Sequence, residues 1–178
     1  GGTLYIKTTV PDTGTGAHTI FRQIVGETLN IPAHTIDVLI GNTDTFPTDV
    51  VVSASRVTYL AGQAAQKAAG ELRERLIAAA SNHLGCPRDS IRITRGTVHG
   101  PNHRRIPFAE IASLTAELKA VGNFNVKEQS GAACIYGQAA EVRVDSETGR
   151  LKILKIVSAN DVGTIIHPIS HQGQIDGA

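Results

Sequence analysis

The stretch SASRVTYLAGQAAQKAAGELRERLIAAAS, residues 53–81, decides the fold of this chain. Apolar residues recur along it every four positions, which predicts one face of a long helix. This stripe consists of Leu60, Ala64, Ala68, Leu72 and Leu76, and Ala61, Ala65 and Ala69 lie beside it. Because small side chains allow another backbone to come close, we expect the helix to be buried over a broad face. Ser53 or Ser55 is expected to cap its first turn.

Shorter elements are predicted on the N-terminal side of this helix. Residues 4–10 and 35–40 are rich in β-branched residues and predict strands. Between them, apolar residues at helical spacing predict a helix over residues 15–29. Residues 41–52 hold Thr, Asp and Pro without periodicity and predict a loop.

On the C-terminal side, residues 91–94 predict a strand, and Pro107 is expected to begin a helix that runs to about Val121. Residues 139–157 alternate apolar and charged side chains around a turn and predict a hairpin. Pro168 is expected to open a last helix. Because strands and helices mix without regular βαβ alternation, the predicted class is α+β, with mixed sheets around a long buried helix.

Composition excludes several classes of protein. The 178 residues are 41% hydrophobic and 19% charged, as in a globular domain. A net charge of +1 argues against nucleic-acid binding, and no apolar run approaches the roughly 20 residues of a membrane span. The two cysteines, Cys86 and Cys134, form no Cys-x-x-Cys pair, which argues against zinc or iron–sulfur ligation by this chain and favours a reducing, cytoplasmic compartment. The chain contains no Met, and we expect it to be a piece of a longer protein.

Two glycine- or hydroxyl-rich turns precede predicted helices. At Gly14-Thr15-Gly16, free N–H groups and the helix dipole would attract phosphate, although a plain tight turn is the simpler interpretation. At Ala54-Ser55-Arg56, Arg56 opposes the helix dipole by a few tenths of a kcal/mol unless an anionic ligand is present. The simpler interpretation there is a helix cap and a solvated surface charge.

Two further groups of residues carry candidate chemistry. His167 and His171 are four residues apart, but no third ligand is spaced to complete a metal site. The nearby Gln174 amide can both donate and accept hydrogen bonds, as a heterocyclic ligand would require. A basic stretch contains a single acidic residue, Asp89, and is interpreted as a solvated or subunit-facing surface. Its arginines are Arg88, Arg92, Arg95, Arg104 and Arg105.

The order and spacing of these motifs resemble the molybdenum-binding catalytic subunit of the xanthine dehydrogenase family, which includes aldehyde oxidoreductases, carbon monoxide dehydrogenase and hydroxybenzoyl-CoA reductase. The family shows acid-x-Gly-Gln-Gly-x-x-Thr, then Ser-Arg-x-Thr-x-x-x-Gly, then a Glu-Val-x-Val-Asp-x-x-Thr-Gly hairpin and a final Pro with Gly-Gln-Ile-x-Gly. The matching residues are Asp12, Gly14, Gly16 and Thr19, then Ser55, Arg56, Thr58 and Gly62, then residues 141–149, and finally Pro168 and residues 173–177. Thr15 stands where the family has glutamine, and His167 where it has asparagine.

The resemblance implies that residues 1–178 are part of a molybdopterin cofactor-binding domain, and it assigns the binding residues. Gly14, Thr15 and Gly16 would face the cofactor, Ala54, Ser55 and Arg56 would line a second edge, and Gln174 would bond to the pterin or the metal's ligands. It also implies a molybdenum–molybdopterin cofactor, in some members a cytosine dinucleotide, with FAD and [2Fe-2S] on partner domains or subunits. The full-length enzyme would be an oligomer acting on a small molecule.

The resemblance further implies an oxidation of aldehydes or N-heterocycles, or a reaction of an aromatic acyl-CoA, with water-derived oxygen and electrons passed to the partners. The family's catalytic glutamate lies in a Gly-x-Gly-Glu motif that these residues lack, so no catalytic residue and no turnover are expected of this fragment alone. Two alternatives stay open. One is a non-catalytic module that docks another subunit. The other is the nucleotide-binding half of a dehydrogenase, which needs a βαβ unit and an acidic residue about 20 residues after Gly16, a distance near which Asp37 lies.

Overall fold

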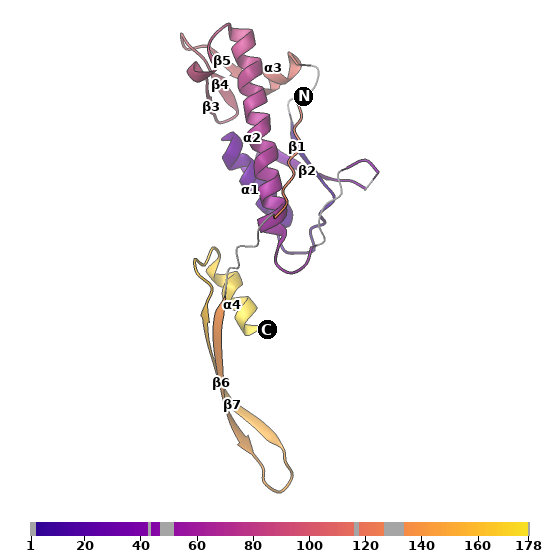
Figure 1. The fold of residues 1–178 in the computed structure, drawn as a ribbon, viewed down its shortest axis with the longest axis vertical. Helices are drawn as coiled ribbons and strands as arrows, with labels where there is room; N and C mark the ends of the chain where they lie inside the picture. The colour runs from indigo at the N-terminus through magenta and orange to yellow at the C-terminus, as the bar shows by residue number, and fades with distance from the viewer. Residues whose placement is uncertain (1–2, 43, 47–51, 116–117, 127–133, 178) are drawn as a thin grey trace. The chain divides into compact units, whose positions relative to one another are not determined.

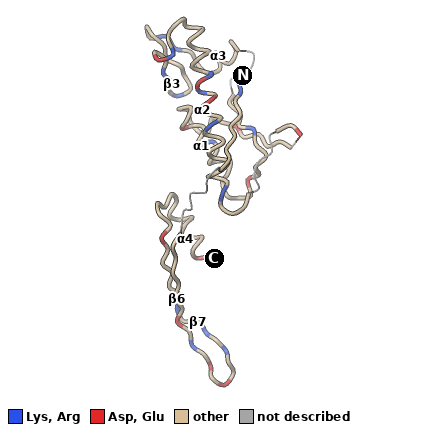
Figure 2. Tube along the Cα trace, in the orientation of Figure 1, with Lys and Arg blue, Asp and Glu red and all other residues tan. Residues whose placement is uncertain are grey.

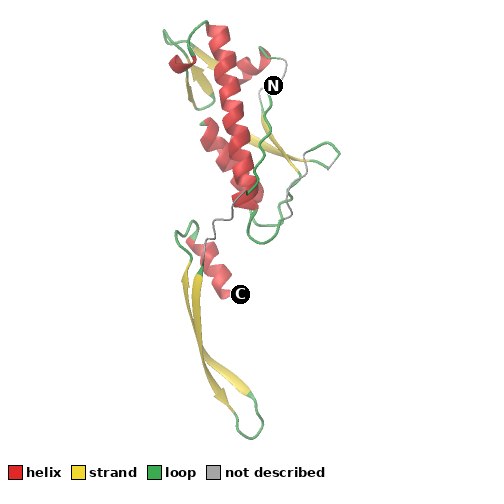
Figure 3. Ribbon diagram, in the orientation of Figure 1, coloured by secondary structure: helices red, strands yellow, loops and turns green. Residues whose placement is uncertain are grey.

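The computed structural model describes residues 3–42, 44–46, 52–115, 118–126 and 134–177. The chain divides into two compact units, Gly1–Lys127 and Glu128–Ala178. The first unit holds β1 to β5 and α1 to α3, and the second holds β6, β7 and α4 (Figure 1). Mixed helix and strand content confirms the predicted α+β class (Figure 3). Among the described helices, none has the length and hydropathy that crossing a bilayer requires.

The first unit begins with a βαβ segment. β1 (Leu4–Thr8) and β2 (Ile36–Ile40) pair in parallel, and α1 (Ala17–Leu29) connects them. The sequence predicted these three elements but not their parallel pairing. β1 ends two residues earlier than predicted, because the Val10 N–H donates to the Thr8 hydroxyl at 3.1 Å and leaves the strand.

The predicted long helix is α2 (Val57–Leu84). Its buried residues are Ala61, Gly62, Ala69, Leu76, Ile77, Ala80 and Leu84, which confirms the long buried helix. The predicted serine cap is wrong. The N-cap position is Arg56, without a side-chain cap bond, and Ser55 has a φ of 51° one residue earlier. A capping serine needs an extended backbone directly before the helix, which Ser55 does not have.

Two apolar clusters show that α1 and α2 run in the same direction. Ala17 and Phe21, near the start of α1, pack with Ala61 near the start of α2. Leu29 at the end of α1 packs with Leu76, which lies further along α2. Figure 1 shows α1 (indigo) beside α2 (magenta). The N-termini of both helices therefore lie at the same end of the unit.

A small antiparallel sheet follows α2. It has the order β3 (Arg92–Thr94), β4 (Thr97–His99) and β5 (Arg105–Pro107), and only β3 was predicted. All three strands are three residues long, too short to show a period, and β4 and β5 form by pairing with neighbouring strands. The predicted helix from Pro107 to Val121 is wrong in length, because α3 spans only Phe108–Ser113. At its end the hydroxyls of Ser113 and Thr115 bond to backbone carbonyls of the preceding turn, which competes with helix continuation.

The second unit is a hairpin followed by a helix. β6 (Ile135–Val144) and β7 (Leu151–Asp161) pair antiparallel, which confirms the predicted hairpin and lengthens it. α4 (Pro168–Asp176) begins at the proline, as predicted. Residues 43 and 47–51 of the predicted 41–52 loop lie outside the described residues.

Candidate functional site

The first candidate turn, residues 12–16, is closed by an acidic side chain. Asp12 Oδ1 accepts hydrogen bonds from the backbone N–H groups of Gly14 and Gly16, both at 3.1 Å. The two glycines have φ values of 92° and 76°, a region that glycine adopts without strain. Apart from the adjacent residues, no atom in the described part of the chain lies within 4 Å of a Cβ built at either position. These two amides are therefore not free, contrary to the expectation from sequence, and the glycines supply a bend and an uncovered main chain.

The first turn stabilises the charged form of the Asp12 carboxyl. Burial raises the pKa of the Asp12 carboxyl, but hydrogen bonds from the backbone of Gly16, Gly14 and His18, together with the His18 charge, outweigh burial. The pKa of Asp12 therefore lies below its usual value. His18 is itself held in place, since its Nε2 lies 2.8 Å from the Val10 carbonyl oxygen.

We expect Asp12→Asn to destabilise the full-length protein near neutral pH and to matter less in acid. Because the folded-state pKa is depressed, the stabilisation is present above the unfolded value of about 3.9 and is lost as pH falls through the folded value. Acid unfolding of both proteins, followed by circular dichroism from about pH 7 to pH 3, measures the difference. A difference that stays constant with pH would show that the carboxylate charge is not involved.

The second candidate turn has an unusual backbone. Ala54 and Ser55 have φ values of 52° and 51°, although neither is glycine. Such conformations cost on the order of 1 kcal/mol each and are concentrated at ligand sites. Ser55 is exposed, and no described residue is hydrogen-bonded to its hydroxyl. The turn thus presents a strained backbone and an available hydroxyl directly before α2.

Two arginines at this end of the unit hold unpaired polar atoms. The Nε atoms of Arg56, at the start of α2, and Arg22, in the second turn of α1, are buried and lack a hydrogen-bond partner among the described residues. A buried N–H without an acceptor costs about 1–3 kcal/mol, so an anionic acceptor there would be favourable. Sequence reasoning missed Arg22. No local pattern marks Arg22, because the dipole effect fades beyond the first turn of a helix and its burial depends on tertiary packing.

Residues that flank the two turns pack in one apolar cluster. Val10 and Ala17, which flank the first turn, are buried in the same cluster as Ala61, and the partly buried Val52 and Val57, which flank the second turn, pack against it. The parallel direction of α1 and α2 therefore brings residues 14–16 and 54–56 to the same end of the first unit. Positive ends of two helix dipoles and two guanidinium groups make this end suited to an anion.

Gln174 belongs to the second unit. It lies on α4 and is exposed. The same helix is capped by His167, whose Nδ1 accepts from the Ser170 N–H at 3.1 Å. His167 thereby serves as an N-cap, a role typical of asparagine, and its Nδ1 is not available to a metal.

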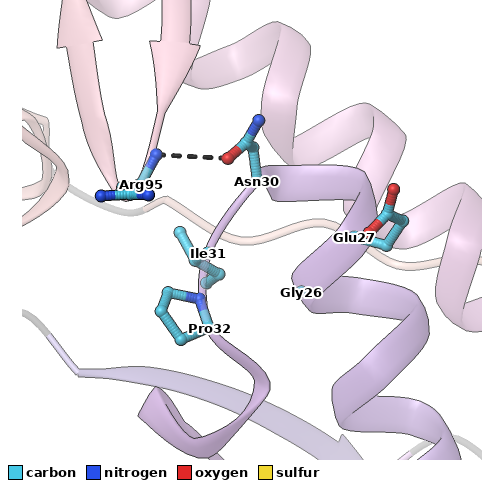
Figure 4. Close-up of a pocket in the computed structure, with 6 residues that line it drawn as sticks. All are labelled: Gly26, Glu27, Asn30, Ile31, Pro32 and Arg95. Atoms are coloured by element: carbon cyan, nitrogen blue, oxygen red, sulfur yellow. Dashed lines mark hydrogen bonds between the residues drawn. The ribbon is translucent and has the colours of Figure 1, made fainter.

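Two cavities lie elsewhere in the first unit. One of about 170 Å³ lies between the end of α1 and the turn after β3, where the Arg95 N–H donates to Asn30 Oδ1 at 3.3 Å (Figure 4). The other, of about 700 Å³, lies between β1, α2 and residues 118–125. None of the six predicted residues of the two turns lines either cavity.

Comparisons with known proteins agree with the resemblance seen in the sequence. The family described as "Molybdopterin cofactor-binding domain" matches residues 1–178. The gamma subunit of the 6-hydroxypseudooxynicotine dehydrogenase complex of Paenarthrobacter nicotinovorans is 31% identical over 99% of this chain and 24% of its own length. The probable hypoxanthine oxidase of Escherichia coli strain K12 is 31% identical over 99% of this chain and 19% of its own.

A solved structure shows the same fold. Quinoline 2-oxidoreductase from Pseudomonas putida 86 matches 97% of this chain and 23% of its own with a TM-score of 0.68 and 26% identity. This chain thus spans about a quarter or less of the length of the proteins it matches.

Proposed function

Because this chain belongs to the molybdopterin cofactor-binding domain family, we propose that the two turns of its first unit bind the phosphate-bearing part of that cofactor. The observation that carries the proposal is the buried, unpaired Arg56 Nε, which lies directly after two left-handed residues at the start of α2. A guanidinium is well suited to donate to phosphate oxygens, and the nearby helix starts add favourable dipoles.

Each of the candidate residues would make a different contribution to cofactor binding. Gly14, Thr15 and Gly16 would allow the cofactor to approach the main chain closely, since beyond the adjacent residues no described atom lies within 4 Å of a Cβ at either glycine. Ser55 offers a hydroxyl and Arg56 a guanidinium, while Ala54 shapes the turn. Gln174, from the second unit, would bond through its amide to the pterin or to the ligands of the metal. When bound, the cofactor supplies two-electron redox chemistry at molybdenum.

For the full-length protein we propose hydroxylation of a small molecule with oxygen from water. A carbon–hydrogen bond is replaced by a carbon–oxygen bond, and two electrons leave through iron–sulfur and FAD units on partner domains or subunits. Hypoxanthine and quinoline, in the names of two relatives, are N-heterocycles and favour that substrate class over aldehydes or aromatic acyl-CoA. The cofactor would be the cytosine dinucleotide form. Two free thiols, Cys86 and Cys134, favour the cytoplasm.

Metal and cofactor analysis of the purified full-length protein tests this proposal. We expect close to one molybdenum per chain by mass spectrometry, with cytidine monophosphate released on acid hydrolysis. A folded protein that assembles with its partners without molybdenum would instead support the docking-module alternative.

One observation supports the dehydrogenase alternative, and others argue against it. β1, α1 and β2 do form a βαβ unit, as that alternative needs. However, Asp37 lies opposite Tyr5 near the start of β2, whereas the acidic residue that binds a ribose follows the strand. The unit then continues with α2 and an antiparallel sheet instead of further crossovers.

A further inference from the structure

Val10 lies between β1 and the first turn, and side chains bind both of its backbone polar groups. Val10 is fully buried. Its N–H donates to the Thr8 hydroxyl at 3.1 Å, and its carbonyl oxygen lies 2.8 Å from His18 Nε2. Because a carbonyl oxygen can only accept a hydrogen bond, Nε2 carries the proton and donates it. The His18 ring thereby supplies a partner that the buried Val10 carbonyl needs.

His18 also bonds to the first turn through its main chain. It is the second residue of α1, and its backbone N–H donates to the Asp12 carboxylate, which also accepts from the Gly16 N–H. Gly16 is the N-cap residue and has no side chain that could cap the helix, so Asp12 takes that role from outside it. The ring of His18 binds Val10 and its N–H binds Asp12, and together these bonds tie the turn to the start of α1.

Packing against Phe21 supports the direction of the His18 ring. The two ring centroids lie 6.4 Å apart at an interplanar angle of 33°, within the range of aromatic contacts. Phe21 is buried in the same apolar cluster as Val10 and as Ala61 of α2. His18 therefore connects the first turn to the cluster in which α1 meets α2, the helix that follows the second turn.

We propose that His18 is a positioning residue for cofactor binding: its bond to the Val10 carbonyl holds the first turn at a fixed place relative to α1. The main chain of Gly14 and Gly16 is thereby kept ready for the phosphate-bearing part of the cofactor. The inference rests on the proposed function, and it gives His18 no contact with the cofactor and no step of the reaction. A binding segment that is already ordered costs less to order on binding, so losing this bond should speed cofactor release.

Cofactor release from the full-length protein, held well below its melting temperature, tests the assignment. The fluorescence of the released and oxidised pterin follows the dissociation rate. Because His18→Ala removes one hydrogen bond, we expect this rate to rise about five- to tenfold. Glutamine places its Nε2 the same number of bonds from Cα as histidine does, so His18→Gln should restore most of the slow release. Asparagine places its amide nitrogen closer to Cα, so His18→Asn should resemble alanine.

The matched control is Arg104→Ala, which removes the same kind of bond at the other end of α2. Arg104 Nη1 donates to the Leu84 carbonyl oxygen at 3.0 Å, and this side-chain-to-backbone bond is partly buried, as the His18 bond is. α2 has 28 residues and leads from the second turn to the small sheet that contains β3, about 40 Å away (Figure 2). The control should lower the melting temperature about as much as His18→Ala and change the release rate less than about twofold.

Three results would overturn the positioning role: wild-type release from His18→Ala, equal acceleration in His18→Ala and Arg104→Ala, or equal release from His18→Gln and His18→Asn. The glutamine and asparagine variants keep the test decisive if the alanine variant does not fold. Failure of the proposed function looks different, because the purified wild type would then contain no molybdenum. A wild type that holds molybdenum, with His18 variants that release it at the wild-type rate, would refute this inference alone.

Discussion

Replacing Gly122 by alanine lowers the stability of the first unit by about 3 kcal/mol, the largest loss we expect from a single methyl group in this chain. A Cβ at this position would lie 1.9 Å from the Ala64 carbonyl oxygen and 2.7 Å from the Ala68 nitrogen. Both are backbone atoms of α2 and cannot rotate away. The segment around Gly122 would have to leave the helix surface.

Gly70→Ala is the matched control, because Gly70 lies within α2 and, apart from adjacent residues and the nearby backbone of that helix, no described atom lies within 4 Å of its Cβ position. Alanine there should raise stability by about 0.8–1 kcal/mol through helix propensity alone. Differential scanning calorimetry of the full-length protein measures both changes. Equal melting temperatures for Gly122→Ala and the wild type would mean that residues 118–126 do not lie against α2.

Arg56→Gln is expected to weaken cofactor binding at least tenfold. A hydrogen bond to a charged group is worth about 1.5–3 kcal/mol, and the buried Nε has no other described acceptor to keep it in place. Under a limiting cofactor supply, the purified variant should therefore contain a small fraction of the wild-type molybdenum. Thermal stability of the cofactor-free protein should not fall, since the variant removes an unpaired buried donor.

Two further variants separate charge from geometry at this position. Arg56→Lys keeps a cation but loses the fork and should recover only part of the molybdenum content. Arg73→Gln removes a partly exposed arginine from α2 and should retain the wild-type content. If Arg56→Gln binds molybdenum like the wild type, the second turn does not hold the phosphate.

Most elements were predictable because their signals are local. The four-residue stripe located α2, and apolar spacing located α1. In the hairpin, Ile153 and Leu154 are both apolar, which conflicts with simple alternation. The structure explains this by a bulge between Glu141 and Val142, which places Val142 opposite Ile153 and leaves Leu154 as the extra residue.

A turn before each of α1 and α2 was predictable, but the chemistry of the two turns was not predictable in detail. Whether an amide is free depends on which side chain reaches it. In the sequence, Asp12 is only one position of a motif. In the structure, its carboxylate accepts hydrogen bonds from the N–H groups of Gly14 and Gly16. The predicted serine cap was wrong for a related reason. Ser55 adopts a left-handed backbone conformation, which no local sequence pattern predicts.

The sequence by itself determined the family, the α+β class and the positions of α1 and α2 along the chain, because these follow from motif order and from periodicities within single elements. The tertiary structure alone decided that α1 and α2 run parallel, that β1 pairs with β2, and that Arg22 and Arg56 keep buried donors unpaired. These features depend on contacts between residues tens of positions apart. Packing, not local propensity, sets which of them meet.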